Sequence, residues 1–450
     1  MIVADKLLTA HRQNVGGSSE YWINEMDAFG VNAIMAASDG IFFSGGTSSY
    51  GSGSADAIFG KLSHSGELLW ARTLGDGITQ TSNSLCVDSS DNLYISGYMY
   101  SSTPYIHDAI LAKYSSSGVL QWQKKYGGTG GEYYYGIKTT SSGNIIAVGQ
   151  TFSTDASGDV LVTHINSLDG TVIWTKTLNS GATDVSYSVD LDSSDNIYIC
   201  GWTNYQNASY RQDNLFASLD INGTIRWGRY SRLNQTLSND ILMDVAVDKS
   251  NSYQYYVGYA DDNASSPTSV RARILRYNST NSQYFGKYFT GLGFTYLNGV
   301  AVDSDGSAII VGYTRTTGST TSKAIGIIFR IDSLGNIDTS FSKQLEYNSS
   351  RNTAPQAVTI DANGNVIVAC HSLITTGMRS TIIKIPSNGT GNGTYGNYTY
   401  SDYTISLING PGFGTAYSYP VSNFSAMTSS YTSFTDMPAP VTQTLNTITP

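Results

Sequence analysis

A short motif that returns at a nearly constant spacing constrains this chain more than any other feature. In one copy, a polar turn of Asp, Ser and Asn at 192–196 precedes the apolar run 197–200, which ends at Gly201. Asp, Ser and Asn favour turns because their short side chains bond to nearby backbone, and Ile and Tyr favour strands. The residues that end the seven copies are spaced 52 to 58 residues apart: Gly45, Gly97, Gly149, Gly201, Gly258, Gly312 and Cys370.

Each period holds four candidate strands, separated by loops rich in Ser, Asp and Gly. The fourth strand carries a recurring aromatic residue: Trp70, Trp122, Trp174 and Trp227, with Tyr284 and Phe341 at about that place in later copies. A lone four-stranded sheet with two apolar faces cannot bury both, whereas sheets in a ring bury them against each other. The sequence therefore predicts an all-β fold, a seven-bladed β-propeller of four-stranded blades over residues 31–386, with a C-terminal extended segment.

The second copy resembles a known family of repeats. The stretch 108–118 (DAILAKYSSSG), Trp122 and the stretch 88–97 (DSSDNLYISG) are together similar to the bacterial β-propeller repeat called SBBP. The likeness covers roughly residues 20–386 and is good in the first four copies. It is weaker in the last three, where the Asp-Ala opening of the third strand is lost. The resemblance implies a β-propeller, and it brings no shared catalytic residues.

The two ends of the chain bear on how the ring closes. The seventh copy supplies three good strands, the third at 380–386, and the sequence that follows at 388–393 is poor strand sequence. Residues 19–26 resemble an orphan fourth strand, and Trp22 lies 48 residues before Trp70, close to one period. We expect the N-terminal segment 1–30 to include this closing strand of the last blade. The alternative is a stray N-terminal extension, with closure by residues 398–407 instead.

Residues 387–450 lie outside the repeats and form a Gly/Asn/Tyr/Ser-rich C-terminal extension. The segment contains five prolines and two acidic residues, Asp402 and Asp436, and has little core of its own. It could be disordered, but its many aromatic residues favour an ordered strap against the propeller or a neighbouring subunit. The expected partners are therefore other structural proteins, in an oligomer or docked through this segment, and surface glycans.

Charge and composition argue against several classes of function. The net charge of −9 and the absence of a basic run argue against nucleic-acid binding. No apolar run is long enough to cross a membrane, and the first residues do not read as a secretory signal. Three well-separated cysteines without a Cys-x-x-Cys pair predict buried free thiols: Cys86, Cys200 and Cys370. The Asp-rich turns lack the late bidentate carboxylate of a calcium loop, so no metal and no cofactor are expected.

The candidate binding site is made of one residue from each copy, namely the residue that follows the terminal glycine, or Cys370 in the seventh copy. If the register holds, these side chains sit at equivalent places around one rim of the ring. Aromatic residues with Gln and His suit stacking on sugar faces or a contact with another protein. The alternative is that they pack between loops and hold the blades together. The candidate rim consists of Tyr98, Gln150, Trp202, Tyr259, Tyr313 and His371, with Gly46 in the first copy.

No catalytic pattern stands out. The glycine-rich stretch 127–131 lacks the Lys-Ser/Thr of a phosphate loop, no Gly-x-Ser-x-Gly elbow occurs, and no acid/base pair is evident. We therefore expect a non-enzymatic virion component of a bacteriophage tail, baseplate or fibre, made in the host cytoplasm, for assembly or host-surface recognition. One alternative is a bacterial cell-surface or secreted propeller that binds carbohydrate or protein. Another is a polysaccharide-active enzyme on a propeller scaffold.

Overall fold

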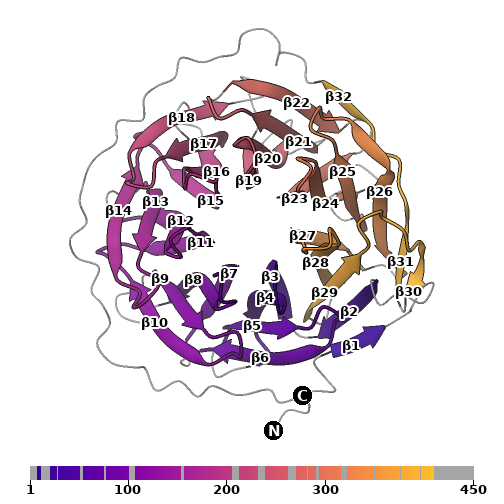
Figure 1. Cartoon of the computed structure of the whole chain (residues 1–450), viewed down its shortest axis with the longest axis horizontal. Coiled ribbons are helices and arrows are strands. Elements are labelled where there is room, and N and C mark those ends of the chain that lie inside the picture. Colours follow the sequence, from indigo (N-terminus) through magenta and orange to yellow (C-terminus); the bar gives the residue numbers. More distant parts are fainter. Residues whose placement is uncertain are drawn as a thin grey trace.

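Small antiparallel sheets follow one another around a ring in the computed structural model (Figure 1). Every regular element among the described residues is a β-strand, which confirms the all-β prediction. The structure describes residues 8–11, 21–27, 29–50, 54–75, 78–100, 107–153, 157–204, 212–231, 239–261, 270–280, 282–289, 293–315, 322–348, 351–374, 377–395 and 397–409.

The first part of the ring consists of sheets of four consecutive strands. They are β3 (Phe29–Ala37), β4 (Gly40–Thr47), β5 (Asp56–Leu62) and β6 (Leu68–Leu74); β7 (Gln80–Val87), β8 (Leu93–Tyr100), β9 (His107–Tyr114) and β10 (Leu120–Tyr126); β11 (Glu132–Thr139), β12 (Ile145–Thr151), β13 (Asp159–Ile165) and β14 (Val172–Leu178); and β15 (Asp184–Leu191), β16 (Ile197–Thr203), β17 (Asp213–Leu219) and β18 (Ile225–Ser231).

The second part keeps this pairing order. Its strands are β19 (Asp240–Asp248), β20 (Tyr253–Asp261), β21 (Val270–Tyr277) and β22 (Gln283–Phe289), then β23 (Phe294–Val302), β24 (Ala308–Arg315), β25 (Ala324–Ile331) and β26 (Ile337–Tyr347), then β27 (Ala354–Ile360), β28 (Val366–Ile374) and β29 (Gly377–Ile385). A short parallel pairing between Val270 and Phe294 joins β21 to β23.

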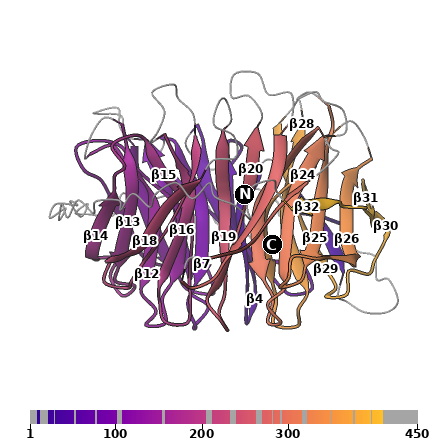
Figure 2. The ribbon, with the colours of Figure 1, turned by 90° about the horizontal axis from the view of Figure 1, so that it is seen from above.

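The first strand of each set lies innermost, and the last lies at the circumference (Figure 1). We call β3, β7, β11, β15, β19, β23 and β27 the inner strands. Seen from the side, the strands run roughly along the axis of the ring (Figure 2). Apolar clusters fill the spaces between neighbouring sheets. This is a propeller-like arrangement, in which each sheet buries both faces against its neighbours.

The two chain ends add strands to the outside of the ring. Strand β2 (Trp22–Asp27) pairs with β29, with Trp22 opposite Lys384, and β1 (Leu8–His11) pairs with β2. Strands β30 (Gly393–Tyr395) and β31 (Tyr398–Asp402) form a hairpin, and β31 pairs with β26. Strand β32 (Leu407–Asn409) pairs with β22. The C-terminal strands thus lie on sheets other than the one that β27 to β29 share with β2. Residues 410–450 lie outside the described part of the chain.

The recurring tryptophan joins several sheets to the next, through an indole hydrogen bond made by Trp22, Trp70, Trp122 and Trp174. The indole Nε1 of Trp70 donates to the carbonyl oxygen of Ser116 at 3.0 Å, in the turn between the third and fourth strands of the following sheet. Gly118 in that turn has φ +78°, and a Cβ there would lie 2.9 Å from the Trp70 ring. Trp22 makes the same contact with the turn at His64 and Gly66. The N-terminal strand therefore carries the same joining residue as the repeats.

One residue of this series was wrongly assigned from the sequence. Phe285, not Tyr284, occupies the aromatic position in the fifth copy, because its ring lies against Gly335 of the next sheet. Tyr284 points outward and is about half exposed, at 49%. Phe341 occupies the predicted position and packs against Gly389. Neighbouring residues of a strand face opposite sides, so a shift of one residue reverses the assignment.

The repeated Asp-rich motif makes turns. The Asp192 carboxylate accepts hydrogen bonds from Ser194 N and Asn196 N, both at 2.9 Å, and from the Tyr198 hydroxyl at 3.0 Å. Asp195 has φ 58° and accepts from Ser141 N of the preceding sheet at 2.8 Å. The carboxylates are thus occupied by protein donors, within one turn and between neighbouring sheets. The three cysteines are free and buried, as predicted.

Candidate functional site

The six side chains predicted to form a rim lie at one register position of the ring. Each sits in the second strand of its sheet and pairs with the residue two places before an irregularity in the inner strand. The pairs are Tyr98 with Thr81, Gln150 with Tyr133, Trp202 with Val185, Tyr259 with Ile241, Tyr313 with Tyr296, and His371 with Ala354. They therefore share the end of the ring at which each inner strand begins.

Aromatic side chains of three neighbouring sheets touch at this end. The ring of Tyr98 lies 5.0 Å from that of Tyr133, centroid to centroid, and Tyr133 stacks on Tyr135 at 5.9 Å. Tyr135 meets Tyr187 edge-on at 5.6 Å. The indole Nε1 of Trp202 donates to the Tyr187 hydroxyl at 2.9 Å. We call these five residues the aromatic belt.

A second aromatic group lies at the same register position farther around the ring. The Tyr296 ring lies 4.8 Å from Tyr259 and stacks on Tyr313 at the same centroid distance. Burial raises the pKa of Tyr259 above its usual range, and the nearby Tyr187 contributes to the rise. Inner-strand tyrosines that the sequence analysis did not select thus connect Tyr98 with Trp202 in the belt, and Tyr259 with Tyr313 in the second group.

The other two predicted rim residues differ in their surroundings. Gln150 is buried at 7% exposure, and its amide lies beside Gly158. His371 is half-buried, and burial lowers the pKa of its imidazole. Neither makes a ring contact with the belt among the described residues. A binding role for Gln150 and His371 remains a prediction.

Every inner strand bulges at one residue, which is skipped in the pairing with its neighbour. An extra residue in one strand bends the strand and re-aims its side chains. The seven bulge residues are Asn32, Asn83, Tyr135, Tyr187, Met243, Asn298 and Gln356. All seven line a central cavity of about 560 Å³. Tyr135 and Tyr187 therefore belong both to the aromatic belt and to the cavity wall.

The bulge amides link neighbouring sheets in part of the ring. Asn32 Nδ2 donates to Ser82 O at 2.8 Å, and Asn83 Nδ2 donates to Tyr134 O at 2.9 Å. Asn298 Nδ2 makes the equivalent bond to Pro355 O at 2.8 Å. Tyr135 and Tyr187 occupy the same position in their strands, but a tyrosine has no amide group to make this link. Each tyrosine instead presents a larger aromatic side chain to the cavity than an asparagine does.

Charged side chains lie farther along the cavity wall, toward the end with the Asp-rich turns. The Asp190 carboxylate lies 3.5 Å from Lys138 Nζ and 3.2 Å from Lys249 Nζ, and it accepts from Val247 N at 2.8 Å. Burial would raise the pKa of Asp190, but the two ammonium groups together with backbone hydrogen bonds outweigh burial, so the pKa lies below its usual range. Asp190 is therefore ionised at neutral pH.

Asp244 is a second carboxylate on the wall, and its pKa is shifted in the opposite direction from that of Asp190. Its oxygens accept from the Ser188 hydroxyl at 2.6 Å and from Val300 N at 2.9 Å, so it bridges the sheets on both sides of its own. Burial raises the pKa of Asp244 to about 6 despite these bonds. In the other inner strands the residue after the bulge is small: Ala33, Ser84, Gly136, Ser188, Gly299 and Ala357. This one departure from a repeat-wide rule is the sequence signal that could have identified Asp244.

The described part of the chain contains neither a metal-binding cluster nor a membrane-spanning helix. Among the described residues, no group of three or more His, Cys, Asp or Glu side chains is placed to hold a metal ion. No helix in that part of the chain is long and apolar enough to cross a membrane. The expectations of no metal and no cofactor remain predictions.

Comparisons with known proteins bear on the fold. No family model and no curated protein matches the chain, so the resemblance to the SBBP repeat remains a prediction. Similar solved structures include an α-L-arabinanase from Penicillium chrysogenum complexed with arabinobiose, with 13% identity, a TM-score of 0.43, and 67% of this chain and 92% of that chain covered. A Dyadobacter fermentans protein of unknown function has 13% identity, a TM-score of 0.42, and coverages of 80% and 96%. Sqt1 from Chaetomium thermophilum has 9% identity, a TM-score of 0.41, and coverages of 79% and 96%.

These comparisons correct the predicted function. The sequence led us to expect a virion component of a phage tail, baseplate or fibre. That expectation is wrong, because the three similar structures include an arabinanase and no virion protein. Because the identities are so low, the likeness concerns the fold. The expectation of no catalytic activity remains a prediction.

Proposed function

We propose that this chain is a seven-bladed propeller that binds carbohydrate chains at the aromatic belt. Each inner strand opens one set of sheet strands, and β2 completes the set that β27 to β29 begin, which supports a count of seven blades. We take residues 31–386 with the N-terminal segment 1–30 as the propeller, and 387–450 as an extension. The observation that carries the binding proposal is the chain of contacts among aromatic side chains from Tyr98 to Trp202, in which Tyr135 and Tyr187 also line the cavity.

The chemistry of the belt suits sugars. Tyr and Trp offer a flat apolar face together with a polar group, and a sugar ring offers C–H faces with hydroxyl groups at its edge. The Tyr98, Tyr135, Tyr187 and Trp202 side chains are all partly exposed, so their faces can be covered by a ligand. The Trp202–Tyr187 bond and the stack of Tyr133 on Tyr135 hold the rings in place before a ligand arrives. A pre-formed surface loses little side-chain entropy on binding.

A glycan panel followed by titration calorimetry tests the proposal. We expect Trp202→Ala and Tyr259→Ala each to weaken binding roughly tenfold while the melting curve keeps a single transition. Tyr284→Ala is the matched control, because Tyr284 is a half-exposed tyrosine of β22, a strand at the outer edge of the ring (Figure 1). Full affinity both in Trp202→Ala of the belt and in Tyr259→Ala of the second aromatic group, or no glycan bound by the unaltered protein, would contradict the proposal.

A second candidate function rests on the two wall carboxylates. Asp190 has a lowered pKa and Asp244 a raised one. Environments that separate the pKa values of two carboxyl groups in this way suit a base and an acid in glycoside hydrolysis. Release of reducing ends from the polysaccharides that bind would support this candidate. Asp244→Asn should then abolish turnover while binding persists, and binding without any turnover would exclude it for those polysaccharides.

A further inference from the structure

Two ammonium groups converge on one carboxylate of the cavity wall. Lys138 belongs to β11, Asp190 to β15, and Lys249 directly follows β19, so three successive inner strands meet there. Both Nζ atoms approach the same oxygen, Asp190 Oδ1, at 3.5 and 3.2 Å. Two cations that share one oxygen atom lie close enough for a single further anionic group to contact both.

Both lysines keep unused binding capacity. Their side chains are 39% and 56% exposed, whereas the Asp190 side chain is 9% exposed. An ammonium group has three N–H donors, and among the described residues the carboxylate that each lysine contacts is that of Asp190. A ligand in the cavity can therefore add an acceptor to each ammonium group without breaking the Asp190 contacts.

We propose that the glycan bound by this protein is acidic, and that Lys138 and Lys249 hold the carboxylate of a uronic acid unit. This inference rests on the proposed function, and it names the class of ligand. The charged residues of the cavity wall are Lys138, Asp190, Asp244 and Lys249, two cations and two carboxylates. A singly charged carboxylate adds one negative charge to this balanced wall, whereas a doubly charged phosphate monoester adds two. The wall therefore favours the carboxylate.

The positions of the aromatic and charged groups fit one oligosaccharide. Tyr135 and Lys138 lie three residues apart on β11, and Tyr187 and Asp190 lie three residues apart on β15. At the rise of a strand, three residues span roughly 10 Å. Both tyrosines and both lysines line the same cavity. Sugar rings against the tyrosines and a carboxylate at the lysines can thus belong to neighbouring units of one chain.

Calorimetry with matched ligands tests this inference. The probes are tetramers of galacturonate, mannuronate and glucuronate, each beside its methyl ester, which has the same sugar rings and no charge. We expect at least one acid to bind, its ester to bind about tenfold more weakly, and the affinity of the acid to fall with added salt. A sulfated oligosaccharide that bound better than every uronate would assign the anion differently and overturn the inference.

Variants of one lysine sharpen the test. Lys249→Gln should reduce the affinity for the acid about fivefold to tenfold and leave the affinity for the ester unchanged, whereas Lys249→Arg should retain binding. Lys176→Gln, on the outer strand β14, controls for the change in net charge. If acid and ester bind alike, or only neutral glycans bind, the inference fails and the belt proposal stands. If no glycan of either kind binds, both fail.

Discussion

The two halves of the ring hold neighbouring sheets together by different means. In the first half Trp70, Trp122 and Trp174 each donate an indole hydrogen bond to the next sheet, at 3.0, 3.1 and 3.0 Å. In the second half Phe285 and Phe341 occupy this position, and phenylalanine has no such donor. Among the described residues, hydrogen bonding between sheets at this position is therefore confined to the first three sheets and to Trp22 of β2, which belongs to the last sheet.

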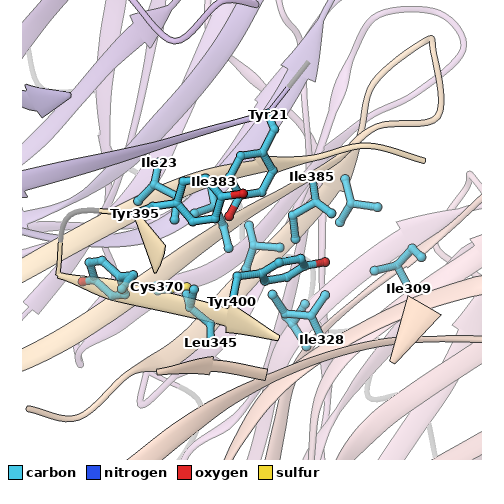
Figure 3. Packing of buried hydrophobic residues seen from close by; sticks show 14 of the residues in the cluster. Tyr21, Ile23, Ile309, Ile328, Leu345, Cys370, Ile383, Ile385, Tyr395 and Tyr400 are labelled. Atoms are coloured by element: carbon cyan, nitrogen blue, oxygen red, sulfur yellow. The ribbon is translucent and has the colours of Figure 1, made fainter. Parts of the chain in front are cut away.

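The same halves differ at their outer edges. Strands β6, β10, β14 and β18 end their sheets, and they carry cations such as Arg72, Lys125 and Lys176, which discourage edge-to-edge pairing. Strands β22 and β26 are instead covered by β32 and β31. Tyr403, Ile405 and Leu407 pack in the cluster that includes Phe285, and Tyr395 and Tyr400 pack in the cluster of Phe341 (Figure 3). The C-terminal strands thus cover the sheets whose repeats have diverged most.

Of the changes predicted here, removal of β30 to β32 should destabilise the second half of the ring the most. A chain that ends at residue 391 loses Tyr395, Tyr398 and Tyr400, which are at most 1% exposed. Burial of three aromatic side chains stabilises by on the order of 4 kcal/mol or more, so the second half should unfold first. Denaturant unfolding is compared with that of a chain ending at residue 410. Equal midpoints for the two truncations would show that these strands do not support the ring.

An alanine in a sheet-joining turn should have the next largest effect. Gly118→Ala places a methyl group against the Trp70 ring at a positive φ, and we expect a loss of about 3 kcal/mol. Gly143 has φ +84° with no atom within 4 Å of an added Cβ, so Gly143→Ala should cost only about 1 kcal/mol of backbone strain. The difference between the two free energies of unfolding isolates the packing on Trp70. Equal losses would mean that the turn geometry alone requires glycine.

The junction of the two halves should respond to pH. Asp244 bonds Ser188 on one side and Val300 on the other, and burial raises its pKa to about 6. Because the folded pKa exceeds the unfolded value of about 3.9, the folded state binds more protons between these values. Stability should therefore fall as pH rises from about 4 to about 6 and then level off.

Burial also raises the pKa of Asp184 to about 6, so part of this slope should persist in Asp244→Asn. Melting temperatures across this pH range provide the measurement. A slope that is unchanged in Asp244→Asn would assign the whole effect to other groups.

The smallest effect should come from single indole hydrogen bonds. Trp174→Phe removes the bond to Ile221 O and should cost about 1 kcal/mol. Trp227 Nε1 is buried without a hydrogen-bond partner among the described residues, so Trp227→Phe should cost less or even stabilise. Chemical denaturation of both variants compares a joined position with an unjoined one. A larger loss for Trp227→Phe would show that ring packing, not the hydrogen bond, decides the strength of the contact.

Part of the candidate site could be predicted from the sequence. The positions after the terminal glycines were found by counting within the repeat, and they do share one register. The sequence did not reveal that Tyr135 and Tyr187 are bulge residues, because a bulge alters the alternation of a strand without changing the period. Nor did it reveal the meeting of Lys138 and Asp190, which lie 52 residues apart. That distance is one period of the repeat, so comparison of equivalent positions between copies could have paired them.

The sequence by itself determined the all-β class, the strand–turn–strand unit and its period. These follow from local preferences of Asp, Asn, Gly and β-branched residues, which act within a few positions along the chain. Only the tertiary structure decided which side chains face the axis and which distant groups meet there. Seven bulges aim one residue of each inner strand at the same cavity, and β2 reaches β29 across more than 350 residues. Contacts of this kind depend on how the sheets pack in space, which local preferences do not encode.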